Sequence, residues 1–222
     1  QKKMKAKRIE YVPGVGIDLE KFRNSSIDKD EVRRAKRDEL GIPQDAKLLL
    51  SVGELNKNKN HETVIRAIVS LDNESRDNLY YVIAGRGERQ EYLQHLIDEL
   101  GLTKQVILLG YRDDISQLYN ASDVFVFPSY REGLPVSLME AMACGLPAVC
   151  SRIRGNMDLI DEVEENGIGG GCLFAPHSVE ECKEALKKLL LLNYKVVGCI
   201  NFKKIEKFSL KKINGVMNKL YN

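Results

Sequence analysis

Short, continuous apolar runs alternate with stretches that carry apolar residues at helical spacing, and this alternation restricts the fold more than any other feature. Each continuous run predicts a strand that is buried on both faces. The predicted strands are 48–53, 79–85, 106–110, 124–127 and 148–150. The predicted helices are 30–40, 62–71, 88–100, 114–120, 136–144, 178–192 and 209–221. The pattern predicts an α/β fold, a Rossmann-like, doubly wound parallel sheet with helices on both faces.

Composition and charge exclude several other classes of protein. The chain has 222 residues, 43% of them hydrophobic, so it can bury a core. A formal net charge of +2 gives no basic footprint for nucleic acid, and no apolar run reaches the ~18 residues of a membrane span. No apolar leader follows the basic start, which predicts a cytoplasmic location, with the inner face of the cell membrane as an alternative. Five cysteines without metal-binding spacing are expected to be reduced and buried.

Polar loops follow the first four predicted strands. They are 53–60, 85–87, 110–112 and 128–135, and each contains glycine. Ligands of an open parallel sheet bind beyond the carboxyl ends of its strands. We therefore expect backbone donors and cations from these loops to line one ligand-binding edge.

The loop 128–135 leads directly into the helix predicted at 136–144. Pro135 suits the first helical position, so the free N–H groups of the first turn should form a phosphate site. Glu132 precedes the helix and Glu140 lies inside it, leaning back towards the same cavity. Two carboxylates around a phosphate site predict a sugar nucleotide. Alternatively, Glu132 only complements the helix dipole and Glu140 is a solvated surface residue.

Residues 132–147 resemble the E-x7-E signature of retaining glycosyltransferases with the GT-B fold, the glycosyltransferase group 1 family. The resemblance covers about residues 9–192 and extends to bacterial enzymes that build capsular polysaccharides or exopolysaccharides. Five further segments are similar to the interdomain connector, the first phosphate loop and the later strand ends of that family: 12–18, 51–60, 83–87, 109–115 and 120–129.

The resemblance implies a role for individual residues. Glu132 would contact hydroxyls of the donor sugar and Lys59 would neutralise the diphosphate, and these two are the predicted catalytic residues. Glu140 would bind the ribose hydroxyls, and Tyr111 would lie against the base. The predicted donor-binding residues are Gly53, Gly85, Gly87, Gly110, Tyr111, Arg112, Gly133, Leu134, Pro135, Val136 and Glu140.

Two residues depart from the family pattern. Glu54 stands where the family usually has Arg, so one cation for the diphosphate is missing, and Lys57 or Arg86 would have to replace it. Gly16 interrupts the connector, where the family usually runs directly from Val to Asp.

Neither a metal nor a cofactor is predicted, because Lys59 and a helix start would stabilise the leaving diphosphate without one. Asp28-Lys29-Asp30 resembles a metal motif, but it follows no apolar strand and is interpreted as a helix N-cap. The glycines of 85–90 do not complete a dinucleotide fingerprint. His61 is interpreted as a solvated helix-start residue, and His95 and His177 as surface or capping positions.

Three segments are predicted: an interdomain connector (1–27), a Rossmann-like nucleotide-sugar-binding domain (28–192) and a Lys-rich helical appendage (193–222). By resemblance, the chain is the donor-binding half of a hexosyl-type glycosyltransferase, lacks its N-terminal domain and is inactive alone. The expected partners are a nucleotide-sugar donor, a saccharide or lipid-linked acceptor and the missing domain. The Lys-rich end would pack on that domain or contact an anionic membrane surface.

Two other functions remain open from the sequence. Glu54 and the missing domain are compatible with a non-catalytic nucleotide-binding or subunit-docking module. A GT-B-fold enzyme of another class, such as a sugar-nucleotide epimerase, is the third reading. Binding of nucleoside diphosphates and their sugars, and its loss in Glu132 and Glu140 variants, would separate these readings.

Overall fold

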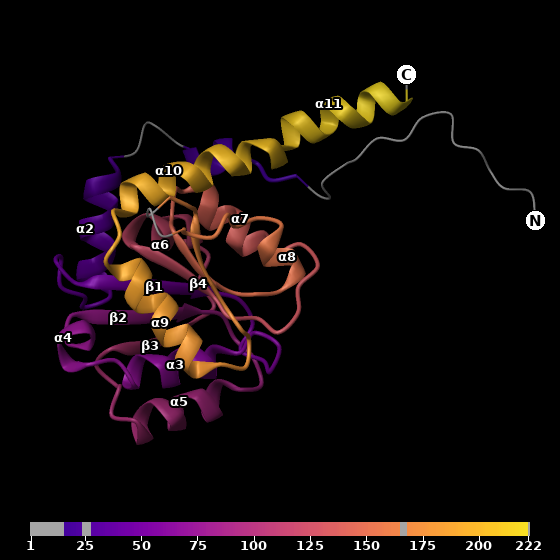
Figure 1. Cartoon of the computed structure of the whole chain (residues 1–222). Helices are drawn as coiled ribbons and strands as arrows, with labels where there is room; N and C mark the ends of the chain where they lie inside the picture. Colours follow the sequence, from indigo (N-terminus) through magenta and orange to yellow (C-terminus); the bar gives the residue numbers. More distant parts are fainter. Residues whose placement is uncertain (1–15, 24–27, 165–167, 222) are drawn as a thin grey trace, which may run out of the picture.

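The computed structural model describes residues 16–23, 28–164 and 168–221 and contains a six-stranded, fully parallel sheet (Figure 1). The strand order is β3-β2-β1-β4-β5-β6, so the chain winds outwards from β1 in one direction and then from β4 in the other. The predicted doubly wound fold is confirmed. The bounds are β1 (Lys47–Val52), β2 (Leu79–Ala84), β3 (Val106–Gly110), β4 (Val124–Phe127), β5 (Ala148–Ser151) and β6 (Gly171–Phe174).

Five of these strands match the predicted ones, and β6 was missed. It begins at the last of three consecutive glycines, 169–171, and such a glycine run predicts a turn or loop and not a strand. β1 and β4 pair at the point where the strand order reverses. Ligands of doubly wound folds bind at this switch point, which fixes where the site should lie.

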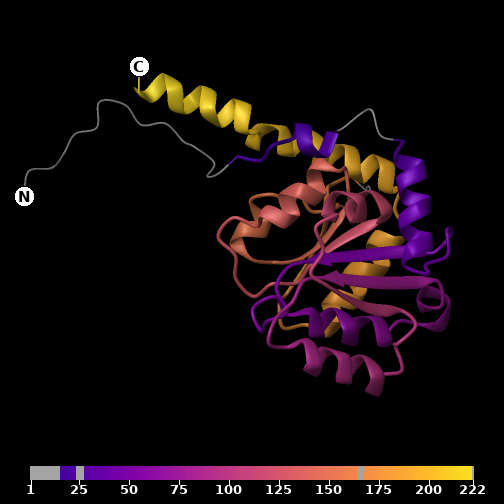
Figure 2. The same cartoon turned by 180° about the vertical axis from the view of Figure 1, so that it is seen from behind.

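Helices cover both faces of the sheet (Figures 1 and 2). One face is covered by α3 (His61–Val69), α5 (Gln90–Glu99) and α9 (Val179–Leu190), and the other by α2 (Lys29–Glu39), α6 (Ile115–Ala121) and α7 (Val136–Ala143). Three single-turn helices were not predicted: α1 (Glu20–Arg23), α4 (Asn73–Arg76) and α8 (Arg154–Met157).

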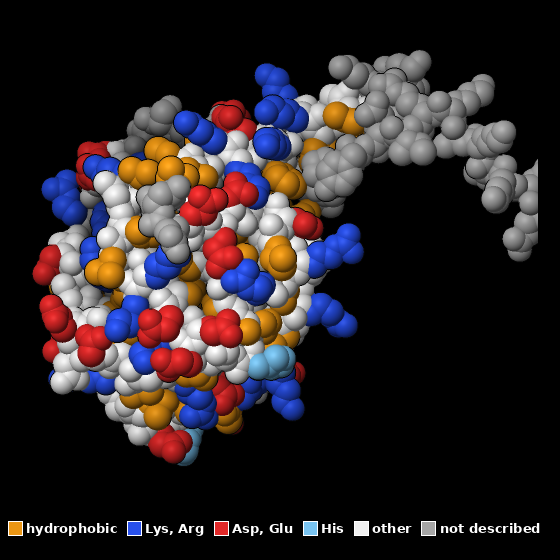
Figure 3. Space-filling view, in the orientation of Figure 1, with side chains coloured by type: hydrophobic (Ala, Val, Ile, Leu, Met, Phe, Trp, Pro, Cys, Tyr) orange, Lys and Arg blue, Asp and Glu red, His pale blue; other side chains and the backbone are white. Residues whose placement is uncertain are grey.

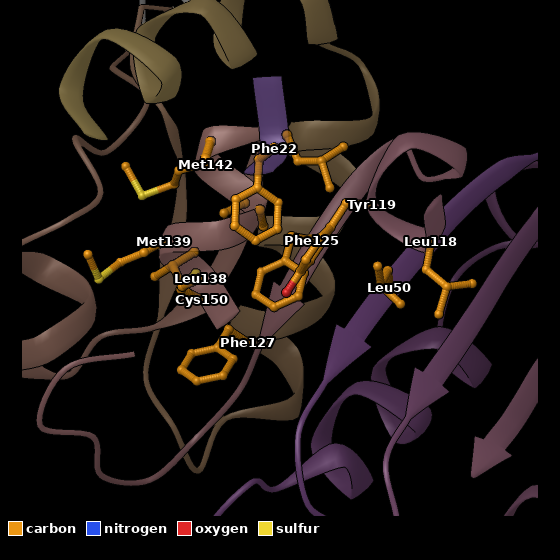
Figure 4. Close-up of a cluster of buried hydrophobic side chains, with 14 of the residues drawn as sticks. Phe22, Leu50, Leu118, Tyr119, Phe125, Phe127, Leu138, Met139, Met142 and Cys150 are labelled. Atoms are coloured by element: carbon orange, nitrogen blue, oxygen red, sulfur yellow. The ribbon is translucent and has the colours of Figure 1, made fainter. Parts of the chain in front are cut away.

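The strands send alternate side chains into two separate cores. On β4, Phe125 and Phe127 enter the core under α6 and α7, whereas Val124 and Val126 enter the core under α3 and α9. Figure 4 shows the first of these cores, where Tyr119 packs edge-on against Phe125 with ring centroids 5.7 Å apart. An unbroken apolar run is therefore required, because each face of the strand is buried.

A buried arginine fixes α2 to the sheet. The side chain of Arg37 is fully buried, and its Nη2 donates to Asp123 Oδ2 at 2.8 Å. Its other donors reach backbone carbonyls, including that of Ala46 at 2.8 Å and that of Ala121 at 3.0 Å. The charged pattern of this helix did not predict a buried position. Burial is possible because every donor group has a partner.

Side chains cap the starts of α2 and α9. Asp28 accepts from the backbone of Asp30 and Glu31 at the start of α2, which confirms its interpretation as a cap. Ser178 accepts from the N–H of Glu181 at the start of α9. Glu181 does not return to the cap, as a full capping box would require, but instead accepts from the N–H of Ala175 at 2.8 Å.

The region after 192 contains more structure than the sequence predicted. An additional helix, α10 (Tyr194–Ile205), packs against the end of α7, where a Cβ at Gly198 would lie 1.9 Å from the Gly145 carbonyl oxygen. Asn201 is fully buried there and donates to the carbonyls of Leu146 and Gly170, both at 2.7 Å. This part of the predicted appendage therefore belongs to the packed domain.

The last helix, α11 (Leu210–Tyr221), follows a short 3-10 turn (Glu206–Phe208) and projects from the body of the molecule (Figures 1 and 2). Basic side chains gather along this edge in Figure 3, and the exposed ones include Lys203, Lys207 and Lys211. No helix of the described residues is long and apolar enough to cross a bilayer.

Most of the predicted connector lies outside the described residues. Its described end pairs with the start of α11, where Ile17 donates to the Phe208 carbonyl and accepts from the N–H of Leu210, both at 2.9 Å. A Cβ at Gly16 would lie 2.8 Å from the Cα of Leu210. The glycine that departs from the family pattern thus stands where the two segments approach most closely.

Candidate functional site

Loops from four strands meet at the carboxyl edge of the sheet. Gly53 donates to the carbonyl of Ala84 at 3.0 Å, which joins the loops after β1 and β2. Gly85 donates to the carbonyl of Gly110 at 2.8 Å, which adds the loop after β3. The N–H of Tyr130 donates to the carbonyl of Asn58 at 2.8 Å and adds the loop after β4. The structure thus brings together the four loops that the sequence singled out.

Glycine allows these loops to touch. A Cβ at Gly85 would lie 1.9 Å from the carbonyl oxygen of Gly53, and one at Gly87 would lie 2.4 Å from that of Leu55. Both obstacles are backbone atoms, which cannot rotate away. Gly133 differs, because a Cβ there would meet nothing within 4 Å. The first two glycines are required by packing, whereas Gly133 faces open space.

Lys59 and Glu132 form an ion pair at the switch point. Lys59 Nζ lies 2.8 Å from Glu132 Oε1, and their side chains are 20% and 14% exposed. The ammonium also lies 4.8 Å from the centroid of the Phe127 ring, a cation–π contact. The pair joins residues from the loops after β1 and β4, 73 positions apart in sequence. The two predicted catalytic side chains are therefore in direct contact.

Asn60 braces the loop that carries Lys59, a role that the sequence did not reveal. It is 3% exposed and adopts a left-handed conformation with φ of 53°. Its Nδ2 donates to the carbonyl of Pro128 at 3.1 Å and to that of Pro176 at 2.9 Å. One buried amide therefore connects the loops that follow β1, β4 and β6.

The start of α7 is open at this edge. The sequence predicted that Pro135 is the first helical residue, but in the structure it is the N-cap residue that precedes the helix. No side chain of the described part of the chain caps this start, and Val136 is 52% exposed. The first-turn N–H groups and the positive end of the helix dipole are available to an anion. Leu134 is partly buried against the core below.

Glu140 has a different partner from Glu132. Tyr119 Oη donates to Glu140 Oε2 at 3.0 Å from the neighbouring helix α6. Burial raises the pKa of the Glu140 carboxyl, and the Tyr119 hydrogen bond and the charge of Lys21 oppose that rise. Glu140 is thus not a solvated surface residue. The convergence of both carboxylates on one ligand stays a prediction.

The loop after β3 carries an exposed aromatic ring. Tyr111 is 69% exposed, and the guanidinium of Arg86 lies 6.0 Å from its ring centroid. Arg112 is paired instead with two carboxylates: its Nη2 lies 2.6 Å from Glu39 Oε1 on α2 and 2.6 Å from Asp114 Oδ2 at the start of α6. Hydrogen bonding from Arg112 holds the pKa of Asp114 well below its usual range. Tyr111 is available to stack on a base, whereas the Arg112 guanidinium is already paired.

The departure at Glu54 is at the surface. Its side chain is exposed and accepts from Asn56 Nδ2 at 2.8 Å. Lys57 and Arg86, the cations that could compensate for it, are both exposed. No group of three or more His, Cys, Asp and Glu side chains that could hold a metal is found in the described ranges. A metal-independent reaction stays a prediction.

The interpretation of His61 as a solvated residue is wrong. It begins α3 but is 3% exposed, and burial lowers its pKa to about 4. The loop after β1 folds back over the helix start, which the sequence pattern alone cannot show. His95 and His177 are exposed as predicted, and His177 stacks on Tyr130 with ring centroids 4.7 Å apart.

The cysteines are all free, as predicted. Cys150, Cys172 and Cys182 are buried, Cys144 is intermediate and Cys199 is exposed. The prediction of buried thiols is therefore wrong for Cys199, because the Lys-rich region forms a helix with one face in solvent.

Comparison with known proteins identifies relatives of this chain. The family described as "Glycosyl transferases group 1" matches residues 32–204. The putative glycosyltransferase EpsD of Bacillus subtilis is 33% identical over 187 residues, which are 80% of this chain and 48% of the relative. The UDP-Gal:alpha-D-GlcNAc-diphosphoundecaprenol alpha-1,3-galactosyltransferase of Escherichia coli is 36% identical over 155 residues, which are 69% of this chain and 39% of the relative. The chain thus spans less than half the length of these two curated relatives.

Solved structures share the fold. Anabaena Alr3699/HepE in complex with UDP and glucose matches 93% of this chain and 55% of its own, with a TM-score of 0.79 and 22% identity. WaaG, a glycosyltransferase involved in lipopolysaccharide biosynthesis, matches 93% of this chain and 56% of its own, with a TM-score of 0.73 and 24% identity. The architecture is the Rossmann-like fold found in GT-B glycosyltransferases.

Proposed function

Because this chain belongs to the glycosyl transferases group 1 family, we propose that it forms the donor-binding half of an enzyme that transfers a sugar from a nucleotide-diphosphate sugar to an acceptor. The observation that carries the proposal is the Lys59–Glu132 pair beside the uncapped start of α7. A cation, a set of free N–H groups and a carboxylate are thereby placed at the switch point of the sheet. A diphosphate with an attached sugar requires these groups.

The proposed donor lies along the carboxyl edge. The base stacks on Tyr111, the ribose hydroxyls bind Glu140 and the diphosphate rests on the first turn of α7. Arrival of the diphosphate gives the Lys59 ammonium a second anionic partner besides Glu132. Glu132 can then accept hydrogen bonds from hydroxyls of the sugar.

The charge distribution of this site suits the transfer step. The acceptor hydroxyl oxygen bonds to the anomeric carbon and its proton passes to the leaving diphosphate, as the bond between the sugar and the diphosphate breaks. In the transition state the sugar ring gains positive charge and the leaving diphosphate gains negative charge. Lys59 and the dipole of α7 stabilise the leaving group, while the Glu132 carboxylate stabilises the sugar. These groups are fixed before the reaction, so little reorganisation is needed in the transition state. The step as proposed needs no metal ion and keeps the anomeric configuration.

We also propose the setting of the reaction. The names of the relatives support a hexosyl donor and a saccharide or lipid-linked acceptor in the synthesis of a surface polysaccharide. The acceptor would be held by an N-terminal domain of the same protein, and this half alone would be inactive. The proposed location is the cytoplasm, at the inner face of the membrane. The exposed lysines along α10 and α11 support a contact there with an anionic surface.

One observation favours a second function. Glu54 is exposed at the first loop, where the family usually has a cation, and its charge would repel a diphosphate. A module that binds a nucleotide weakly without transferring sugar is therefore the alternative. Lys57 and Arg86 are both exposed near this loop. The transferase function requires that one of them replace the missing cation, whereas the non-catalytic module does not.

Calorimetry on the chain tests the proposed function, with UDP, GDP, ADP and the matching nucleotide sugars as ligands. We expect Lys59→Met to weaken diphosphate binding by roughly 10- to 150-fold, since a charged hydrogen bond contributes about 1.5–3 kcal/mol. Glu132→Gln should weaken binding of the nucleotide sugar more than binding of the nucleotide.

Glu184→Gln is the matched control, because Glu184 lies on α9 with a side chain that is 59% exposed. It should change neither affinity. The proposal is wrong if no nucleoside diphosphate binds or if Lys59→Met binds as tightly as the original chain.

A further inference from the structure

A buried imidazole lies under the loop that carries Lys59. His61 is 3% exposed, and its Nδ1 lies 3.3 Å from the hydroxyl of Tyr81 on β2. The Tyr81 hydroxyl lies 2.7 Å from Ser51 Oγ on β1, and Ser51 Oγ donates to the Val126 carbonyl on β4 at 2.5 Å. A single chain of hydrogen bonds thus runs from the start of α3 across three neighbouring strands.

The direction of this chain follows from its last member. A carbonyl oxygen only accepts, so the Ser51 hydroxyl must donate to Val126. Ser51 Oγ then accepts from the Tyr81 hydroxyl, and the Tyr81 oxygen accepts from His61 Nδ1–H. The imidazole is therefore the first donor of the chain, and this arrangement selects the neutral tautomer with its proton on Nδ1.

The other side of the ring faces the loop. His61 Nε2 is buried and has no hydrogen-bond partner among the described residues; burial lowers the pKa of the ring, and the nearby backbone of Glu54 opposes this effect only in part. The positive charges of Lys59 and Arg89 add to burial in disfavouring a protonated imidazole. The ring is thus a neutral support, fixed below by the sheet and in contact above with the first residues of the loop.

Lys59 is closely connected to this support. Its own N–H donates to Asn56 Oδ1 at 3.0 Å, and only Asn60 separates it from His61. A shift of the start of α3 would therefore move the backbone of Lys59 directly. A displacement of about 1 Å is enough to weaken an oriented polar contact severely.

We propose that His61 is a positioning residue for donor binding: the chain through Tyr81 and Ser51 fixes the start of α3 and thereby holds the Lys59 ammonium where the diphosphate binds. The inference rests on the proposed function and adds a residue that does not touch the ligand. According to this inference, the conformation of the loop after β1 depends on a hydrogen-bond chain inside the sheet.

A double-mutant cycle with UDP as the probe tests the inference. His61→Phe keeps a ring of similar size but removes the donor, and we expect it to weaken UDP binding about tenfold. In the Lys59→Met background the same change should alter affinity less than about twofold, because the cation that it positions is absent. His61→Asn, whose amide can donate near the position of Nδ1, should recover most of the affinity.

Ile68→Ala is the control for a purely structural effect. Ile68 lies on the same helix and is 1% exposed, but it is far along the helix from the loop. It should lower the melting temperature without changing UDP affinity. The inference is overturned if His61→Phe binds UDP as the original chain does, or loses equal affinity with and without Lys59. If the original chain binds no UDP, GDP or ADP, the proposed function itself fails and the inference fails with it.

Discussion

Replacing Gly133 with alanine should separate ligand binding from folding. A Cβ there would meet no heavy atom within 4 Å, and the φ angle of Gly133 is not positive, so its backbone conformation is open to alanine. The free energy of unfolding should stay unchanged or rise by about 0.4–1 kcal/mol, because alanine restricts the unfolded chain. The added methyl group would occupy space proposed for the donor, so the affinity for a nucleotide sugar should fall by about 1–3 kcal/mol, the usual cost of overpacking.

Gly85→Ala provides the opposite case on the same edge. Its Cβ would lie 1.9 Å from the carbonyl oxygen and 2.8 Å from the carbonyl carbon of Gly53. Neither backbone atom can rotate away, so the cost should reach the upper end of overpacking, about 3 kcal/mol. For a chain of this length each kcal/mol lowers the melting temperature by about 2–4 °C. We therefore expect a loss of about 6–12 °C.

Both variants are measured by thermal and urea denaturation and by calorimetric titration with UDP and UDP-sugars. The expected pattern is a stable Gly133→Ala that binds poorly and a Gly85→Ala with a clearly lowered melting temperature. The reasoning is refuted if Gly133→Ala loses as much stability as Gly85→Ala, or if it binds nucleotide sugars with unchanged affinity.

Three further predictions follow from buried polar groups. Arg37→Met should lower the free energy of unfolding by about 3–5 kcal/mol in urea, because Asp123 and several carbonyls lose a buried partner; a loss below about 1 kcal/mol would contradict this. Burial lowers the pKa of His61 to about 4 in the folded chain, so as the pH falls His61 is protonated in the unfolded chain before it is protonated in the folded one. Stability should therefore fall by about 3 kcal/mol between pH 6.5 and 4, and His61→Phe should remove this component, as denaturation at each pH would show. Tyr119→Phe should raise the pKa of Glu140 further, because it removes a hydrogen bond to the carboxylate. An unchanged Glu140 titration by NMR would exclude that role.

Several features of the fold could be predicted because they depend on local pattern. A strand buried on both faces needs a continuous apolar run, and β1 to β5 each have one. By contrast, β6 begins at the end of a run of glycines, and α10 carries little helical periodicity, so both were missed. Their positions depend on packing against β5 and α7.

The solvent exposure of charged and titratable residues could not be predicted in the same way. Arg37 and His61 both lie at positions that a helical pattern assigns to a solvated face or end. Arg37 is buried because carbonyls from two separate segments, 43–46 and Ala121, surround it, and His61 is buried because a loop folds over it. Residues distant in sequence form each of these environments, so local periodicity cannot predict that the two side chains are buried.

The doubly wound sheet, the edge where the polar loops meet and the residue types gathered there follow from the sequence alone, because parallel strands place all their carboxyl ends together. The side-chain pairings at that edge depend on the three-dimensional arrangement. Lys59 meets Glu132 across 73 positions and Tyr119 meets Glu140 across 21, because the strand order sets β1 beside β4 and brings α6 against α7. Such contacts depend on the order of the strands in the sheet, and this order cannot be read from the spacing of residues along the chain.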